Sequence, residues 1–168
     1  MTHPPVHTTE ESFVAALMAF DHHRARPLAE LLRPDDFAAP AIRLVHELVG
    51  QLCDAGVSPD PAAVLALAIS EERVRGEHHI KTFTGVLMRL MDHRALNDPA
   101  SVRWYAAHAL ERAWRRRTVE MTTRLAQVAD HADPDELDRL AHVELAAVDA
   151  VRARHRALTR PSGLVVAA

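Results

Sequence analysis

The chain has 168 residues, of which 48% are apolar and 4% aromatic, and it carries a formal net charge of −3 at pH 7. This length suits one domain, or a compact head with an extension, whose core is built from Ala, Leu and Val. The acidic balance argues against a general nucleic-acid binder, and the single cysteine, Cys53, excludes an internal disulfide and a multi-cysteine zinc site. There is neither a signal-peptide pattern nor an apolar run of roughly 18 residues, so we expect a cytoplasmic protein without membrane contact.

Helix signals run through the chain, and no stretch shows the apolar-polar alternation of a strand, so the sequence predicts an all-α protein. Residues 1–7 are expected to form a flexible arm. Thr8 and Glu11 have the spacing of a capping box and predict a first helix over residues 8–20. Further starts are marked by prolines or Asp-Pro pairs, and Gly56 marks a helix end. These signals predict helices over residues 27–32, 40–55, 61–69 and 80–91, with a loop over 70–79.

Two longer helices are predicted in the second half of the chain. Asp98 with Pro99 begins a helix that reaches about Ala129, and Asp133 with Pro134 begins another that reaches about Leu158. Only a few residues join them, so we expect an antiparallel hairpin. The predicted layout is a flexible arm over 1–7, a compact helical head over 8–96, a long antiparallel helical hairpin over 98–158 and a frayed tail over 159–168.

A short acidic-aromatic run identifies a family resemblance. The residues Pro34, Asp35, Asp36 and Phe37 follow a short helix and precede a longer one, and an Asp-Pro start comes next at Asp60. This order resembles the amino-terminal domain of the bacterial replicative DNA helicase, the DnaB family. The stretch WYAAHALERAWRRRTVEMTTRLAQVA, residues 104–129, is similar to that domain's tyrosine, helical spacer and Arg-Arg, so that the resemblance covers most of residues 9–157.

The resemblance implies a helical collar that assembles and docks partners and performs no chemistry. Where the family often has an aromatic residue and a histidine, this chain has Ala38 and Ile42, and the family's glycines are reduced to Gly76. The chain ends where the family's linker and ATPase would begin, and its five glycines build no GxxxxGK[ST] phosphate loop. We therefore expect no enzymatic activity and no cofactor.

The hairpin is the predicted interaction surface. Apolar residues recur at three-four spacing on both of its helices, at Trp104, Ala107, Trp114, Met121, Leu125 and Val128 and at Leu137, Leu140, Ala141, Leu145, Val148 and Val151. Such stripes close a hairpin, but two helices bury only their facing sides, and a second hairpin would complete a four-helix bundle. The family dimerises by this kind of contact, so we expect a homodimer. The residues predicted to carry the dimer or partner interface are Trp104, Trp114, Arg115, Arg116, Met121 and Leu125.

Three alternatives accompany this interpretation. A basic patch on the first long helix, comprising Arg112, Arg115, Arg116, Arg117 and Arg124, could contact an acidic partner or DNA phosphate, or be a solvated surface balanced by Asp133, Asp135, Glu136 and Asp138. The helicase-docking domain of primase, also a head with a hairpin, is a second possibility. The pairs His22-His23 and His78-His79 suggest a metal-dependent enzyme, but adjacent helical residues diverge and no HExxH spacing occurs.

The sequence therefore predicts a non-catalytic protein–protein interaction module similar to the helicase amino-terminal domain. Its expected partners are itself, through the hairpin, and the replicative helicase, primase or both, in bacterial, phage or plasmid DNA replication. The alternative is a small helical nucleic-acid-binding regulator that uses the Arg112–Arg124 patch. We expect direct nucleic-acid binding to be weak or absent, and no metal to be bound.

Overall fold

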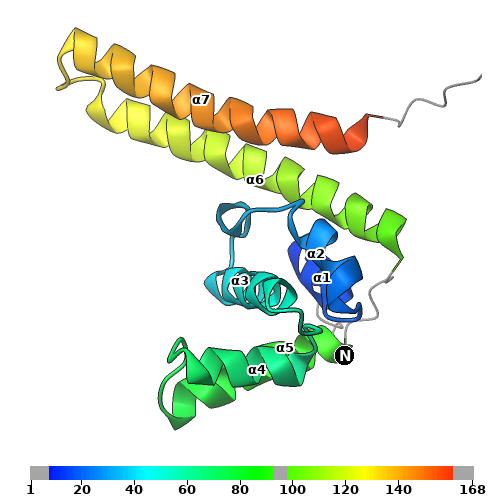
Figure 1. Ribbon diagram of the computed structural model, residues 1–168. Coiled ribbons are helices and arrows are strands. Elements are labelled where there is room, and N and C mark those ends of the chain that lie inside the picture. Colours follow the sequence, from blue (N-terminus) through cyan, green and yellow to red (C-terminus); the bar gives the residue numbers. More distant parts are fainter. Residues whose placement is uncertain (1–7, 93–97, 161–168) are drawn as a thin grey trace, which may run out of the picture. The chain divides into compact units, whose positions relative to one another are not determined.

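A computed structural model describes residues 8–92 and 98–160 of the chain, and every regular element in these ranges is helical (Figure 1). This confirms the predicted all-α class. The elements are α1 (Thr9–Leu17), α2 (His22–Ala29), the 3-10 turn η1 (Pro34–Asp36), α3 (Pro40–Asp54), α4 (Pro61–Ser70), α5 (Glu77–Asp92), α6 (Pro99–Val128) and α7 (Pro134–Thr159). The predicted arm (1–7), the end of the predicted head (93–96) and most of the predicted tail (161–168) lie outside the described residues.

The chain divides into two compact units, and the division falls within α6, between Ala109 and Leu110. The first unit contains α1 to α5 and the first turns of α6, where Val102, Ala106 and Ala109 are fully buried. The second unit contains the rest of α6 and all of α7.

The first two helices begin at side-chain caps. In α1 the Glu11 N–H donates to Thr8 Oγ1 (3.2 Å) and the Thr8 N–H donates to Glu11 Oε2 (2.9 Å), which is the predicted capping box. The helix ends at Leu17, short of the predicted residue 20. The predicted start of the second helix at Pro27 was wrong. Asp21 Oδ1 accepts the N–H of Arg24 (3.0 Å), so α2 begins at His22 and contains Pro27.

Proline is tolerated inside α2 because the helix is short. Pro27 lies near its carboxyl end and removes a single intrahelical hydrogen bond. The cap at Asp21 stabilises the free N–H groups of the first turn, so that the helix can start before the proline.

The acidic-aromatic run forms a structural turn in the head. Asp36 is buried and accepts the N–H of Arg33 at 2.7 Å, which closes η1. Phe37 is fully buried, with its ring centroid 4.7 Å from that of His46 on α3 and 6.3 Å from that of Phe13 on α1. The run therefore closes a turn and directs an aromatic ring into the core where α1 and α3 meet.

The central helix of the head, α3, has both ends as predicted. Pro40 is its first residue, and Gly56 follows its carboxyl end with φ +73°, a conformation that glycine adopts without strain. The Val57 N–H donates to the Leu52 carbonyl (2.8 Å), which satisfies one of the last carbonyls of the helix. The chain then reverses toward α4.

Helices α4 and α5 lie side by side (Figure 1). Asp60 Oδ1 accepts the N–H groups of Ala62 and Ala63, both at 2.9 Å, so α4 begins at Pro61 as predicted. The start of α5 was predicted too late. It begins at Glu77, directly after Gly76, whose φ is +78°.

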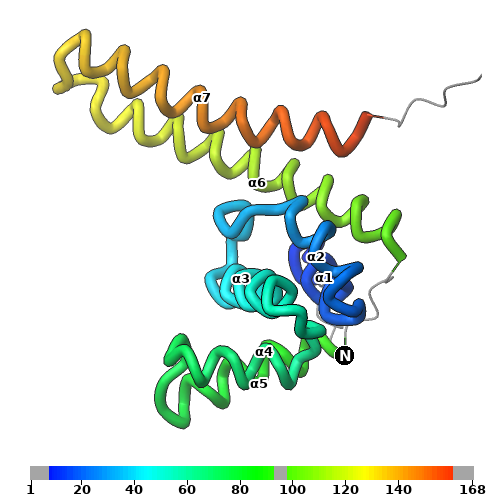
Figure 2. The backbone as a smooth tube through the Cα atoms, viewed as in Figure 1, coloured from blue at the N-terminus to red at the C-terminus, as the bar shows by residue number. Residues whose placement is uncertain are grey.

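The second unit is an antiparallel hairpin (Figure 2). Arg124 of α6 pairs with Glu144 of α7, and Arg152 of α7 covers Trp114 of α6, with 5.4 Å between its guanidinium carbon and the ring centroid. Moving toward the amino end of α6 therefore leads toward the carboxyl end of α7, which is the antiparallel register. Asp133 caps α7 by accepting the N–H of Asp135 at 3.0 Å.

Candidate interaction surfaces

The seam between the two hairpin helices contains three of the six predicted interface residues. Trp114, Met121 and Leu125 are half-buried on α6 and lie four or seven residues apart, on the face that Arg152 covers. Only two α7 side chains, Val148 and Val151, are buried. The hairpin therefore has a thin core.

One position of the predicted α7 stripe was wrong. Leu145 is exposed, and the half-buried position belongs to its neighbour Glu144, which pairs with Arg124 across the seam. Five of the buried and half-buried residues of α7 keep alternating four- and three-residue spacing, namely Leu137, Ala141, Glu144, Val148 and Val151, and Leu140 of the predicted stripe is half-buried as well. Leu145 is one residue, about 100°, out of this phase.

Apolar side chains also lie on the outside of the hairpin. Val143 is 62% exposed, and Val119 and Leu145 are exposed as well. Single exposed apolar residues are ordinary, but these three occur on both helices of a unit whose own seam is thin. The outer surface of the hairpin therefore has apolar area that a partner can bury.

Carboxylates neutralise much of the predicted basic patch. Arg115 donates to Glu111 Oε1 from Nη2 (2.6 Å) and Nε (3.2 Å), and Arg116 Nε lies 4.0 Å from Glu120 Oε1. The remaining members of the patch are Arg112, which is exposed, Arg117, which is half-buried, and Arg124, which pairs with Glu144. The acids predicted to balance the patch lie at the start of α7, whereas the partners observed are on α6 and in the middle of α7. The patch has little excess charge for DNA phosphate.

Trp104 lies on the part of α6 that belongs to the first unit, and its side chain is 54% exposed. Its ring centroid lies 3.9 Å from that of His108 and 5.6 Å from that of Tyr105, both on the same helix. The predicted interface residues therefore fall into two groups: an exposed tryptophan here, and Trp114, Arg115, Arg116, Met121 and Leu125 in the second unit.

Comparison with known proteins shows that this chain resembles a solved structure in its fold. No protein-family model matches the chain, and no curated protein does. A crystal structure of the N-terminal domain of DnaB helicase from Mycobacterium tuberculosis matches with a TM-score of 0.64 and 23% identity, over 83% of this chain and 94% of that one. This chain has the fold of the DnaB N-terminal domain. At this identity the likeness establishes the fold alone, and it confirms the fold that the resemblance predicted.

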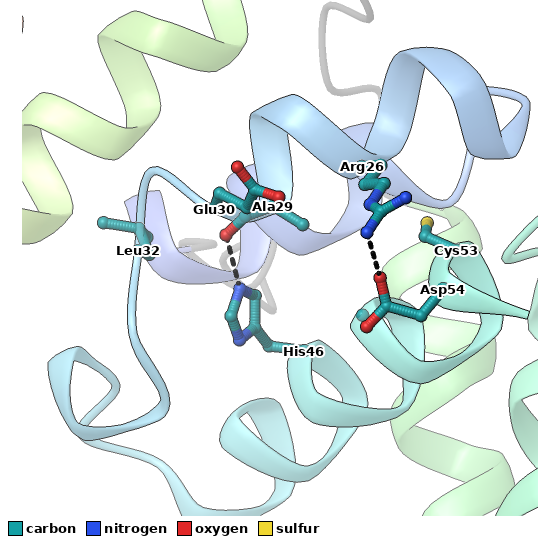
Figure 3. Close-up of a pocket in the computed structure, with 8 residues that line it drawn as sticks. Arg26, Ala29, Glu30, Leu32, His46, Cys53 and Asp54 are labelled. Atoms are coloured by element: carbon teal, nitrogen blue, oxygen red, sulfur yellow. Dashed lines mark hydrogen bonds and ion pairs between the residues drawn. The ribbon is translucent and has the colours of Figure 1, made fainter.

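Within this DnaB-like head, a small cavity of about 190 Å³ lies between α2 and α3 (Figure 3). Arg26 and Asp54 form an ion pair at 3.1 Å, and His46 Nε2 donates to the Ala29 carbonyl at 3.0 Å. Burial raises the pKa of the Cys53 thiol, which also lines the cavity, and this disfavours its thiolate form.

The histidine pairs of the DnaB-like head do not form a metal site in the described residues. His22 and His23 stack with ring centroids 3.9 Å apart, and His78 and His79 meet edge to face at 5.8 Å. Within residues 8–92 and 98–160, no three His, Cys, Asp or Glu side chains gather where they could hold a metal ion. No helix in these ranges is long and apolar enough to cross a bilayer.

An apolar groove between α4 and α5 was not predicted from the sequence. Its lining includes Leu65, Met88 and Met91. A signal was available, because the α4 segment PAAVLALAIS is apolar on every side, which is typical of a helix that is covered all round.

Proposed function

We propose that this protein is a non-catalytic association module of DNA replication that acts in the cytoplasm. Its hairpin binds the hairpin of a second copy, and the assembly docks on the replicative helicase, on primase or on both. The observation that carries this proposal is the hairpin itself: a helicase-domain fold whose α6–α7 unit has a thin seam and an apolar outer surface.

The geometry of the second unit favours self-association. A lone pair of helices buries only its facing sides, whereas two hairpins packed together form a four-helix bundle with a shared core. The half-buried residues Trp114, Met121 and Leu125 would then lie at the bundle interior, and Val143 would be covered at its edge. Arg115 and Arg116 would flank the contact with their carboxylate partners.

The proposed partners follow from the protein that shares the fold, which is a domain of a DNA helicase. This is an argument by analogy, since one fold can serve several functions. Trp104 and the outer apolar residues of the hairpin supply the side chains that an additional protein would contact. A catalytic role has no support in the sequence, which lacks a phosphate-binding loop.

Sedimentation velocity on the purified chain, alone and mixed with the replicative helicase from the same cell, tests both the self-association and the docking on the helicase. We expect a dimer alone and co-sedimentation in the mixture. Val143→Glu should shift the chain toward monomer, because it places a charge on the surface proposed to be buried. Val57→Glu, at another exposed valine outside the hairpin, is the matched control. A monomer at all concentrations would refute self-association, and a dimer that ignores both helicase and primase would refute the replication role.

A further inference from the structure

Helix α4 has more apolar surface than the chain itself covers. It contains no charged residue between Pro61 and Ser70, yet only Val64 and Ala68 are buried. Ile69 is 43% exposed, and Leu65, four residues earlier on the same face, is half-buried. A helix that is apolar all round is normally enclosed, so a face of α4 is left without a partner in the described structure.

This face continues onto α5 and forms a groove. The cavity between the two helices measures about 360 Å³. Met88 is 56% exposed and Met91 is 60% exposed. The residues that line the groove are Asp60, Pro61, Ala62, Leu65, Thr84, Leu87, Met88 and Met91. Methionine is unbranched and polarizable, and grooves that bind amphipathic helices use it because it adapts to the incoming side chains.

Charge around the groove selects the chemistry of that occupant. Three arginines of the α4–α5 segment are already paired: Arg73 with Glu47, Arg75 with Glu72 and Arg89 with Glu11. Four acidic residues of the same segment form no ion pair in the described part of the chain, and they are Asp60, Glu71, Glu77 and Asp92. Lys81 is the one cation left to oppose them in residues 60–92. Asp60 lines the groove and Asp92 directly follows Met91, so the end of the groove formed by the start of α4 and the end of α5 carries negative charge.

We propose that the α4–α5 groove is a docking site for a basic amphipathic helix of a partner protein. The apolar face of that helix would lie against Leu65, Met88 and Met91, and its Lys or Arg side chains would meet Asp60 and Asp92 at one end of the groove. This surface is separate from the hairpin, so the proposal does not depend on self-association or on the helicase analogy.

Peptides of defined charge test this directly on the full chain. The probe is a Leu/Lys peptide of about 14 residues with leucine at helical spacing, which spans about 21 Å when helical. A Leu/Glu peptide with the same leucine positions tests the charge, and a scrambled Leu/Lys peptide tests the amphipathic pattern. The readout is the NMR signal of ¹³C-labelled methionine methyl groups, assigned with Met88→Leu and Met91→Leu.

We expect the Leu/Lys peptide to shift the Met88 and Met91 signals and to leave Met121 on the hairpin unchanged. Met88→Lys should weaken binding about tenfold or more, because it puts a like charge in the apolar centre of the contact. Ala126→Lys, at an exposed apolar site on α6 outside both proposed interfaces, is the matched control and should change affinity less than about twofold. Asp92→Lys should weaken binding and reduce its dependence on salt.

Several outcomes would overturn the proposal. Shifts of equal size with the Leu/Glu peptide would contradict the preference for a basic helix. Shifts of equal size with the scrambled peptide would contradict the requirement for an amphipathic one. Shifts that include Met121 to the same extent would show non-specific binding. Methionine signals that move with protein concentration when no peptide is present would show that a second copy of the chain fills the groove. Far-UV circular dichroism of each variant confirms that it is folded, and none of these results depends on whether the hairpin dimerises.

Discussion

The guanidinium of Arg152 covers the indole ring of Trp114, with 5.4 Å between the guanidinium carbon and the ring centroid. The pair joins the carboxyl half of α7 to α6, and the ion pair between Arg124 and Glu144 joins the same helices closer to their connection. These two contacts fix the register of the hairpin. They also show how the hairpin is stabilised. Each contact uses a charged side chain to link the two helices across a seam that has few buried side chains.

Replacing Trp114 with alanine should destabilise the hairpin. The substitution removes the largest side chain of the α6 seam and its cation–π contact, which together correspond to about 1–2 kcal/mol of unfolding free energy for a half-buried tryptophan. Urea unfolding followed by circular dichroism measures the change. Trp104→Ala is the control, since its exposed ring contacts residues of its own helix, and it should cost about 0.5 kcal/mol or less. Equal losses for the two variants would contradict this account of the seam.

The two neighbouring aspartates before Phe37 should differ sharply in their contribution to the unfolding free energy. Asp36 is buried and accepts the Arg33 N–H, so Asp36→Ala leaves this part-buried donor without its acceptor and should lower the unfolding free energy by about 1–2 kcal/mol. Asp35 is exposed and lies 4.0 Å from Arg43, so Asp35→Ala should change it by about 0.5 kcal/mol or less. Thermal or urea unfolding of both variants decides the matter. A larger effect at Asp35 would mean that the run has a role other than closing η1.

Two glycines of the α3 region should respond in opposite directions to alanine. Gly56 has φ +73°, where a side chain is strained, so Gly56→Ala should cost about 1 kcal/mol. Gly50 is inside α3, and an added Cβ meets nothing within 4 Å, so Gly50→Ala should stabilise the protein by about 0.5–1 kcal/mol. Unfolding curves of the two variants against wild type provide the measurement. A stabilising Gly56→Ala would mean that the end of α3 does not require a left-handed residue.

Helix starts were the part of the fold most accessible from the sequence. Thr8, Asp60 and Asp98 each cap a helix through hydrogen bonds to N–H groups two or three residues away, so the information is local. The prediction was wrong at α2, because Pro27 was taken as the helix start although the capping residue is Asp21. The cap at Asp21 set the start of α2, and Pro27 is accommodated inside the helix.

Surface patches were harder to predict, because they depend on what the rest of the chain covers. The spacing of Leu145 suits the seam almost as well as that of Glu144, and only the register with α6 distinguishes them. Met88 and Met91 alternate with buried residues of α5, and their exposure follows from the position of α4. Periodicity indicates which residues share a face, but the neighbouring element decides whether that face is covered.

Acid should destabilise the head through His46. Its side chain is buried, Nε2 donates to the Ala29 carbonyl, and Nδ1 has no partner in the described structure. Burial lowers the pKa of His46 below the ordinary 6.5, and this outweighs the hydrogen bond to the Ala29 carbonyl and the carboxylates of Asp36 and Glu47, which all raise the pKa.

The sign of the effect follows from proton binding. Between the lowered pKa of His46 in the folded protein and about 6.5, the unfolded chain binds more protons than the folded one, so the unfolding free energy decreases as pH falls through this window. Urea unfolding in steps from about pH 7.5 to about pH 5 should show this decrease. In His46→Gln, whose amide can still donate to the Ala29 carbonyl but does not titrate, the decrease should be smaller. His131→Gln, at an exposed position, should keep the wild-type profile. If His46→Gln retained the full decrease, the acid sensitivity would have to arise from another group.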